Sequence, residues 1–188
     1  MTFTTRLPAP DSRRRARGFT LAEVMIAATL GSFVLLGILT AFLFLVRSGA
    51  NLRNYNDMES QARKALEIFA EDTRQASAVT WTSADSITLV VNSANVTYAY
   101  ASGNFTRTTN SGTRTLLTGI TTFSFLAYSI TGTAITDFST AAALIAANGV
   151  TKQIQISLSA SRNTTTVTTA TNIVLSARYV LRNKHVTA

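Results

Sequence analysis

The chain has 188 residues, with 17 lysines and arginines, 9 aspartates and glutamates, and no cysteine. This length allows one modest domain beside an apolar segment, and the lack of cysteine excludes disulfides, thiol nucleophiles and cysteine-based zinc sites. The formal charge of +8 does not predict a nucleic-acid partner. Half of that excess lies in residues 1–18, and no basic stripe with interleaved aromatic residues follows them.

Residues 1–18 form a polar, basic leader. They contain one acid, both prolines of the chain and five arginines, of which four stand near the end of the leader: Arg13, Arg14, Arg15 and Arg17. Such a composition is typical of a targeting segment rather than of a folded domain. Because these arginines precede an apolar run, the positive-inside rule predicts a cytoplasmic N-terminus and an extracytoplasmic remainder.

Residues 19–46 form the apolar run, in which Glu23 is the one charged residue. Its uncharged part, Val24–Val46, has 23 residues. As a helix this part spans about 35 Å, enough to cross a hydrocarbon core of about 30 Å. A carboxylate near the bilayer costs roughly 2.5–3.5 kcal/mol on insertion scales, so it should have a partner. A cut between Gly18 and Phe19 would create the natural one, an amine at the start of the chain.

The junction before this run reads Arg17-Gly18-Phe19-Thr20-Leu21-Ala22-Glu23. Followed by more than twenty apolar residues, it resembles the cleavage and methylation signal of type IV pilins and the related pseudopilins. The resemblance implies that a prepilin peptidase cuts after Gly18 on the cytoplasmic side, that Phe19 becomes N-methylated, and that Glu23 is needed for assembly.

The same resemblance implies the partners and the location of the protein. The implied partners are the prepilin peptidase, other pilin or pseudopilin subunits, an inner-membrane assembly platform and membrane lipid. The implied location is the bacterial inner membrane, crossed once, with a periplasmic C-terminal domain, and then a pilus or a type II secretion pseudopilus. The sequence leaves the choice between these two machines open.

Helical patterning resumes after residue 46 and continues over residues 47–79. Apolar and small residues recur there at spacings of three and four, which predicts an amphipathic continuation of the first helix. The stripe consists of Leu52, Tyr55, Met58, Ala62, Ala65, Leu66, Phe69, Thr73 and Ala76. On the polar side Glu59 and Arg63 have the i,i+4 spacing of an ion pair. The stripe predicts a sheet packed against this half of the helix.

Residues 80–188 are rich in threonine, valine and isoleucine with an apolar period of two, which predicts a β-rich extracytoplasmic domain. The expected strands are 87–91, 95–101, 105–109, 115–117, 119–128, 151–160 and 172–181. Asn163–Thr166 is expected as a polar hairpin loop, and Thr140–Asn148 as either a surface loop or one helical turn. Strands in sequence with tight turns predict an antiparallel sheet, so the fold class is α+β and pilin-like.

No enzyme is predicted, and neither a cofactor nor a metal is expected. Beyond the leader, the acids outside the helix are Asp85 and Asp137, which are far apart in sequence, with no histidine near either and no glycine-rich phosphate loop. Both fit solvated turn residues. Trp81 fits a core position at the boundary between helix and sheet, whereas Arg178 and Arg182 fit a solvated face of the last strand.

Two absences separate the chain from well-known major pilins: its apolar helix has no proline, and it has no cysteine for a C-terminal disulfide loop. Both favour a minor pilin or a type II secretion pseudopilin. Arg63–Ala76 and Val180–Asn183 are also similar to that group, which implies a priming or tip-complex role.

The alternative interpretation is a secreted or membrane-anchored β-rich domain unrelated to filament assembly. For it, Ser12-Arg13-Arg14 would belong to a twin-arginine signal and Ser48-Gly49-Ala50 would be a signal-peptidase site. Against it, a secretory apolar core runs over about 7–15 residues, and the uncharged run here is longer.

Overall fold

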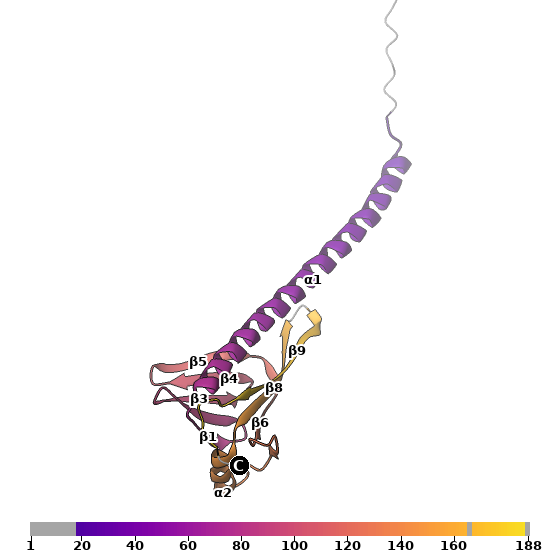
Figure 1. The fold of residues 1–188 in the computed structure, drawn as a ribbon. Helices are drawn as coiled ribbons and strands as arrows, with labels where there is room; N and C mark the ends of the chain where they lie inside the picture. The colour runs from indigo at the N-terminus through magenta and orange to yellow at the C-terminus, as the bar shows by residue number, and fades with distance from the viewer. Residues whose placement is uncertain (1–17, 165–166, 187–188) are drawn as a thin grey trace, which may run out of the picture. The chain divides into compact units, whose positions relative to one another are not determined.

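The computed structural model describes residues 18–164 and 167–186, and the chain divides into two compact units, one up to Leu45 and one from Val46 onward (Figure 1). Helix α1, Leu21–Gln75, belongs to both units. Among the described residues the second unit also holds helix α2 and nine strands. These are β1 Ala78–Ser83, β2 Ser86–Val91, β3 Ala94–Ala101, β4 Asn104–Thr109, β5 Gly112–Thr118, β6 Ile120–Tyr128, β7 Ala134–Ile135, α2 Ala141–Val150, β8 Gln153–Thr164 and β9 Val167–Val180.

Part of the predicted stripe on α1 enters the core of the second unit. Its buried members are Met58, Ala62, Ala65, Phe69 and Thr73, which confirms that a sheet packs on this half of the helix. Leu52 and Tyr55, earlier on the same stripe, are instead exposed. The predicted ion pair is present, since Arg63 Nε lies 3.0 Å from Glu59 Oε1. The helix ends at Gln75, with Arg74 in the last turn, where a cation interacts favourably with the helix dipole.

The strands are antiparallel, as predicted, and form two sheets rather than one. The first sheet is a meander with the order β1-β2-β3-β4-β5, and the second has the order β7-β6-β8-β9. Tight turns join neighbouring strands of the first sheet. At the β3–β4 turn, Ser102 and Gly103 have φ values of 48° and 78°, which is the left-handed geometry that two-residue hairpins require.

Gly119 lies where the chain passes from the first sheet to the second. Its φ is +76°, and a Cβ added there would lie 2.7 Å from the carbonyl oxygen of Ser161. The Ser161 N–H donates to the Gly119 oxygen at 2.8 Å. Both the backbone conformation and this close approach therefore require glycine.

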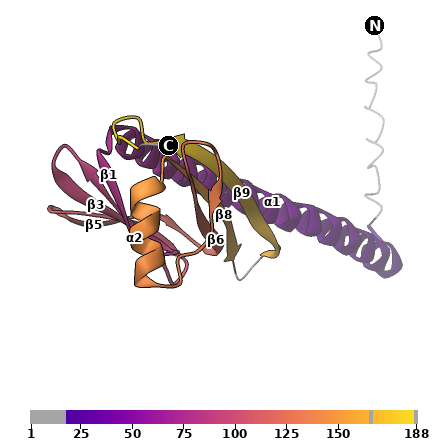
Figure 2. The ribbon, with the colours of Figure 1, turned by 60° about the horizontal axis from the view of Figure 1, so that its bottom comes forward.

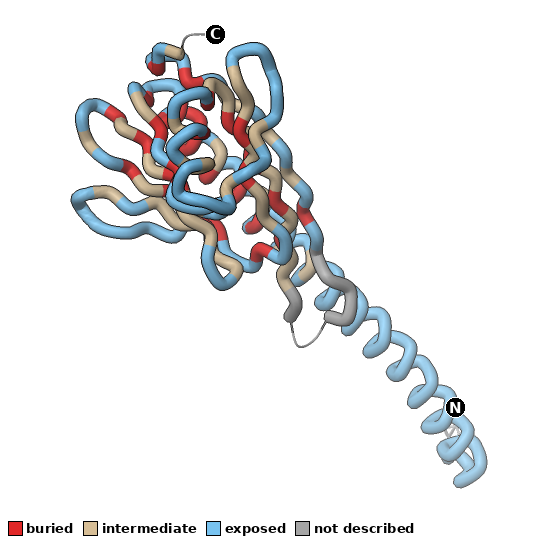
Figure 3. Tube along the Cα trace, turned by 90° about the horizontal axis from the view of Figure 1, so that it is seen from below, coloured by how far each residue is buried: buried red, intermediate tan, exposed pale blue. Residues whose placement is uncertain are grey.

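The core of the second unit is built around Phe69 of α1. Its ring contacts Tyr98 and Phe105 from the first sheet and Phe125 and Tyr179 from the second, with centroid distances of 4.9–6.3 Å. Figure 3 shows the buried residues in red, all within this unit. On β8, Ile154, Ile156, Leu158 and Ala160 are all buried, so the predicted inward face of that strand is confirmed.

The structure differs from the sequence-based expectations in several places. Residues 78–83 and 134–135 form strands that the pattern does not predict. The ambiguous segment after residue 140 is a helix, α2, capped by Thr140, whose Oγ1 accepts from Ala143 N–H at 3.1 Å. It packs against β1 (Figure 2). The hairpin loop expected from Asn163 starts too early, since β8 continues through Thr164 and residues 165–166 lie outside the described residues.

Candidate functional site

The N-terminal end of α1 is closed by a reciprocal hydrogen-bonded cap. Thr20 precedes the helix, and its Oγ1 accepts from the Glu23 N–H at 3.2 Å. In return, Glu23 Oε2 accepts from the Thr20 N–H at 2.9 Å and from the Thr20 hydroxyl at 3.0 Å. This is the capping box of a Thr-x-x-Glu sequence, which satisfies two orphan donors at the helix start. The spacing is readable from the sequence, but the interpretation of Glu23 as the partner of a Phe19 amine overlooked it.

The cap fixes where the candidate cleavage site stands. Gly18 and Phe19 precede the helix in non-helical backbone, and the Phe19 side chain is 85% exposed. The peptide bond between them therefore does not have to be unwound from a helix. Because Glu23 is bonded to the nitrogen of Thr20, its carboxylate is held next to the residue that a cut after Gly18 would make the new terminus.

The apolar part of α1 is uncovered within the described residues. Every residue from Leu21 to Ala50 is exposed, and an 18-residue window of the helix has a mean hydropathy of 2.4. Three hydroxyls in it are satisfied by the helix itself: those of Thr29, Ser32 and Thr40 donate to the Ile26, Ala28 and Leu36 carbonyls at 2.8–2.9 Å. Such back-bonding lets hydroxyl side chains enter lipid without unpaired donors.

Two other sets of residues named from the sequence do not form part of this N-terminal geometry. Arg13, Arg14, Arg15 and Arg17 lie outside the described residues. Ser48-Gly49-Ala50, the signal-peptidase-like site of the alternative interpretation, lies inside helix α1.

Comparison with known families finds a match to the prokaryotic N-terminal methylation motif over residues 13–39. The match covers the basic leader, the Gly18–Phe19 bond, the capped Glu23 and the first part of the apolar helix. The long N-terminal helix and the antiparallel sheets agree with it. Together these features fit a type IV pilin-like protein. No curated protein matches the chain.

The motif has direct implications for the chain. It implies processing by a prepilin peptidase and assembly with pilin subunits. Together with the exposed apolar helix it indicates membrane anchoring. The motif family is structural rather than enzymatic, and the described residues contain no group of three or more histidine, cysteine, aspartate or glutamate side chains that could hold a metal.

The pilin-like domain also contains a buried polar cluster around Asp72 of α1. Its carboxylate lies 2.7 Å from Arg107 Nε on β4 and accepts from the hydroxyl of Tyr98 on β3. Burial raises the pKa of Tyr98, and the hydrogen bond to Asp72 raises it further. The Asp72 carboxylate therefore joins α1 to β3 and β4 through one ion pair and one hydrogen bond.

Beyond the leader, the two acids outside helix α1, Asp85 and Asp137, both lie at exposed positions between secondary-structure elements. Asp137 Oδ1 accepts from the N–H and the hydroxyl of Ser139, at 3.0 and 2.7 Å, and the N–H bond lowers the pKa of this exposed carboxyl. Asp85 lies in the β1–β2 turn and is exposed. Neither has a titratable partner among the described residues. Trp81 is 2% exposed, and its Nε1 donates to Thr151 Oγ1 at 3.1 Å, which confirms a core position.

A second buried cluster, which the sequence did not predict, fixes the last residues of the domain. Lys184 is 7% exposed, and its ammonium donates to the main-chain oxygens of Asn148 and Thr151 at the C-terminal end of α2. Lys152 donates in turn to the main-chain oxygen of Lys184. No carboxylate among the described residues pairs with Lys184. Burial, with a smaller contribution from Lys152, lowers the pKa of Lys184 to about 8.

This lowered pKa predicts a stability that rises with pH. Between pH 8 and the unfolded pKa of about 10.4, the unfolded chain binds more protons at Lys184 than the folded chain does. We expect the unfolding free energy to rise by about 1–2 kcal/mol from pH 8 to 9.5, as measured by Trp81 fluorescence in urea. Lys184→Met should abolish this rise. An unchanged pH slope in the variant would contradict the assignment to Lys184.

Proposed function

We propose that this protein is a minor type IV pilin-like or pseudopilin subunit that is processed by a prepilin peptidase and assembled into a pilus or a type II secretion pseudopilus. The observation that carries the proposal is the methylation motif over residues 13–39, which leads directly into a capped, uncovered apolar helix. Its role is mechanical: subunits leave the membrane and bundle their apolar helices into the core of a filament.

Each residue of the N-terminal site has a role in this proposal. The arginines at 13, 14, 15 and 17 hold the leader at the cytoplasmic face, following the positive-inside rule. The peptidase cuts between Gly18 and Phe19, and Phe19 becomes N-methylated. Glu23 then pairs with the amine of Phe19 and sets the register of assembly. The domain after the apolar helix is periplasmic, and the protein crosses the bacterial inner membrane once.

The proposed assembly is energetically reasonable for an uncovered apolar helix. Moving from lipid into a bundle of similar helices exchanges one apolar environment for another, so little hydrophobic free energy is lost. The pairing of Glu23 with an amine is worth up to about 4 kcal/mol at 4 Å before desolvation is subtracted. In this proposal the apolar helices pack together as the filament core, and the pairing of Glu23 with the amine sets their axial register.

The minor role rests on two features of the chain, the apolar helix without proline and the lack of cysteine. A minor subunit primes assembly or stands in a tip complex, so its effect on filament number exceeds its share of filament mass. No cofactor, nucleic acid or catalytic step enters this proposal. The other partners would be further pilin or pseudopilin subunits and the inner-membrane assembly platform.

Mass spectrometry of the membrane-extracted protein tests the processing step. We expect a chain that starts at Phe19 with a methylated amine, because the leader holds the Gly18–Phe19 bond at the membrane face outside helix α1. A mature chain starting at Asn51 would favour the secreted β-rich domain instead. Quantification of the same chain in sheared filaments tests the minor role, since a dominant species there would contradict it.

A further inference from the structure

The two sheets have four edge strands among the described residues, and three of them are protected. Unpaired strand edges invite pairing with other chains, and proteins usually block them. β1 lies against α2, whose Asn148 side chain accepts from the Trp81 main-chain N–H at 2.6 Å. β7 is protected by its length of two residues, and it covers β6 only at Ala127 and Tyr128. β5 carries Arg114, which lines a hollow together with Lys64 of α1, so its edge is charged.

The fourth edge strand, β9, has none of these protections. It has 14 residues with no proline, lysine or acid. Its one charge, Arg178, is drawn back over the sheet, where the guanidinium lies 3.6 Å from the centroid of the Tyr128 ring and donates to Gln155 Oε1. No charged side chain of β9 therefore blocks the free edge of the second sheet.

The register shows which main-chain groups of β9 point outward. Gln153 pairs with Val180, and the Leu181 N–H donates to the Lys152 oxygen at 2.9 Å. Hydrogen-bonded and non-hydrogen-bonded positions alternate in an antiparallel ladder. The odd-numbered residues of β9 thus bond to β8, and the even-numbered ones direct their N–H and C=O groups to the free edge. These are Asn172, Val174, Ser176, Arg178 and Val180, and no described residue forms a hydrogen bond with their main-chain groups.

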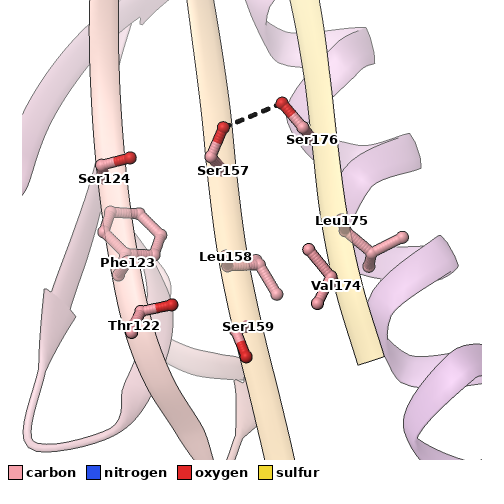
Figure 4. A pocket seen from close by; sticks show the side chains of 9 residues that line it. All are labelled: Thr122, Phe123, Ser124, Ser157, Leu158, Ser159, Val174, Leu175 and Ser176. Atoms are coloured by element: carbon pink, nitrogen blue, oxygen red, sulfur yellow. Dashed lines mark hydrogen bonds between the residues drawn. The ribbon is translucent and has the colours of Figure 1, made fainter. Parts of the chain in front are cut away.

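Apolar side chains remain uncovered on both faces of β9. On the inner face Leu175, Ala177 and Tyr179 are half-buried, although the β8 residues opposite them are fully buried. On the outer face Val174 is 77% exposed. A hollow of about 450 Å³ lies beside it. Figure 4 shows the side chains of β6, β8 and β9 that line this hollow, among them Thr122, Ser157 and Ser176. One more strand would cover the inner residues, and the hollow has room for a bulky side chain from it.

Charge identifies the kind of strand that fits. Arg162 of β8 lies opposite Thr171 of β9, Arg178 lies on β9, and the exposed Arg182 follows it, whereas neither β8 nor β9 contains an acid. These basic residues favour an acidic neighbour. We propose that the free edge of β9 pairs with an acidic, extended strand of a neighbouring filament subunit, which continues the second sheet across the subunit boundary. This proposal rests on the proposed function, because it names the surface through which that assembly continues outside the membrane.

Ser176→Pro tests the edge directly in full-length protein expressed with its filament machinery. Proline removes an N–H that faces outward and leaves the main-chain bonds to β8 intact, which edge strands tolerate. The bonds of the Ser176 hydroxyl to Gln155 and Ser157 are lost, and they are lost equally in the alanine control. We expect the fraction of the chain in sheared filaments to fall at least about tenfold. Ser176→Ala, which keeps the N–H, should assemble like wild type. Equal Trp81 unfolding midpoints would show that the fold is intact.

Val174→Glu is the second variant and does not depend on whether proline is tolerated. It places a charge on the free edge that repels an acidic partner, so incorporation should fall to a similar extent. Thr122→Glu is its matched control, because Thr122 lies in the same row and on the same face of the sheet, two strands away from β9. Equal loss in both glutamate variants would mean that the face, not the edge, is the contact.

Glu23→Ala separates failure of this proposal from failure of the proposed function. If Glu23→Ala is excluded from filaments while Ser176→Pro and Val174→Glu assemble normally, filament assembly stands and the pairing of β9 is wrong. If all three are excluded and the two controls assemble, both hold. If Glu23→Ala and both β9 variants assemble like wild type, the chain is a filament subunit, but neither the role of Glu23 nor the pairing of β9 holds. If the wild-type chain itself is absent from sheared filaments, the proposed function is wrong.

Discussion

Asp72→Ala is expected to lower the unfolding free energy of the second unit by about 2–4 kcal/mol. The substitution leaves the Arg107 guanidinium without its carboxylate and the Tyr98 hydroxyl without its acceptor. Tyr98 is fully buried, whereas the Arg107 side chain is 28% exposed, so water relieves part of the cost. Fluorescence of Trp81, the one tryptophan of the chain, would follow unfolding of the full chain in detergent.

Asp137→Ala is the matched control for this prediction. Its carboxylate is exposed and bonds only within its own turn, to Ser139, so its loss should change stability by no more than about 0.5 kcal/mol. Comparable destabilisation by both substitutions would mean that the buried cluster has no special role in joining α1 to the first sheet.

Glu23→Ala is expected to leave membrane insertion and cleavage intact while reducing incorporation into filaments at least about tenfold. Loss of a carboxylate from a membrane segment favours insertion, so any defect must arise later, when the pair with the Phe19 amine would form. A lost pair worth about 2–4 kcal/mol is sufficient for this effect. Co-purification of the variant with sheared filaments measures it, and normal co-purification would rule out the assembly role.

Glu23→Gln distinguishes pairing from capping. Glutamine at this position still completes the capping box with Thr20 but carries no charge. If the charge pair sets the register, Glu23→Gln should fail to assemble as Glu23→Ala does. Recovery of assembly by glutamine would show instead that the carboxylate acts by closing the start of helix α1.

The parts of the fold that follow a regular period could be predicted from the sequence. The stripe through Phe69 on α1 and the alternation from Ile154 on β8 each repeat over several residues, so burial of one face follows. β1 could not be found in this way, because Ala78 follows the helix almost at once and no turn cluster marks the change. The pairing of Asp72 with Arg107 joins residues 35 positions apart, and no local pattern specifies that distance.

In the candidate sites, too, the residues that could be predicted from the sequence are those that form a local pattern. The residues of the N-terminal site were readable because leader, glycine, carboxylate and apolar run are adjacent in sequence. Thr20 was also readable, since a threonine three positions before a glutamate marks a helix start. Lys184 was not, because nothing near it in the sequence indicates that it bonds the end of a helix more than thirty positions earlier.

The packing of α1 against the end of the chain sets the order in which the second unit completes its fold. Phe69 contacts Tyr179, and the Asn183 side chain donates to the Gln75 oxygen across 108 positions. Contacts this distant close late, because the whole intervening chain must be present first. A chain emerging from its N-terminus therefore keeps the part of the stripe that contacts β9 uncovered until β9 arrives, although the first sheet can cover the rest earlier. We therefore expect the α1 surface that contacts β9 to be the last part of the core to be covered during synthesis.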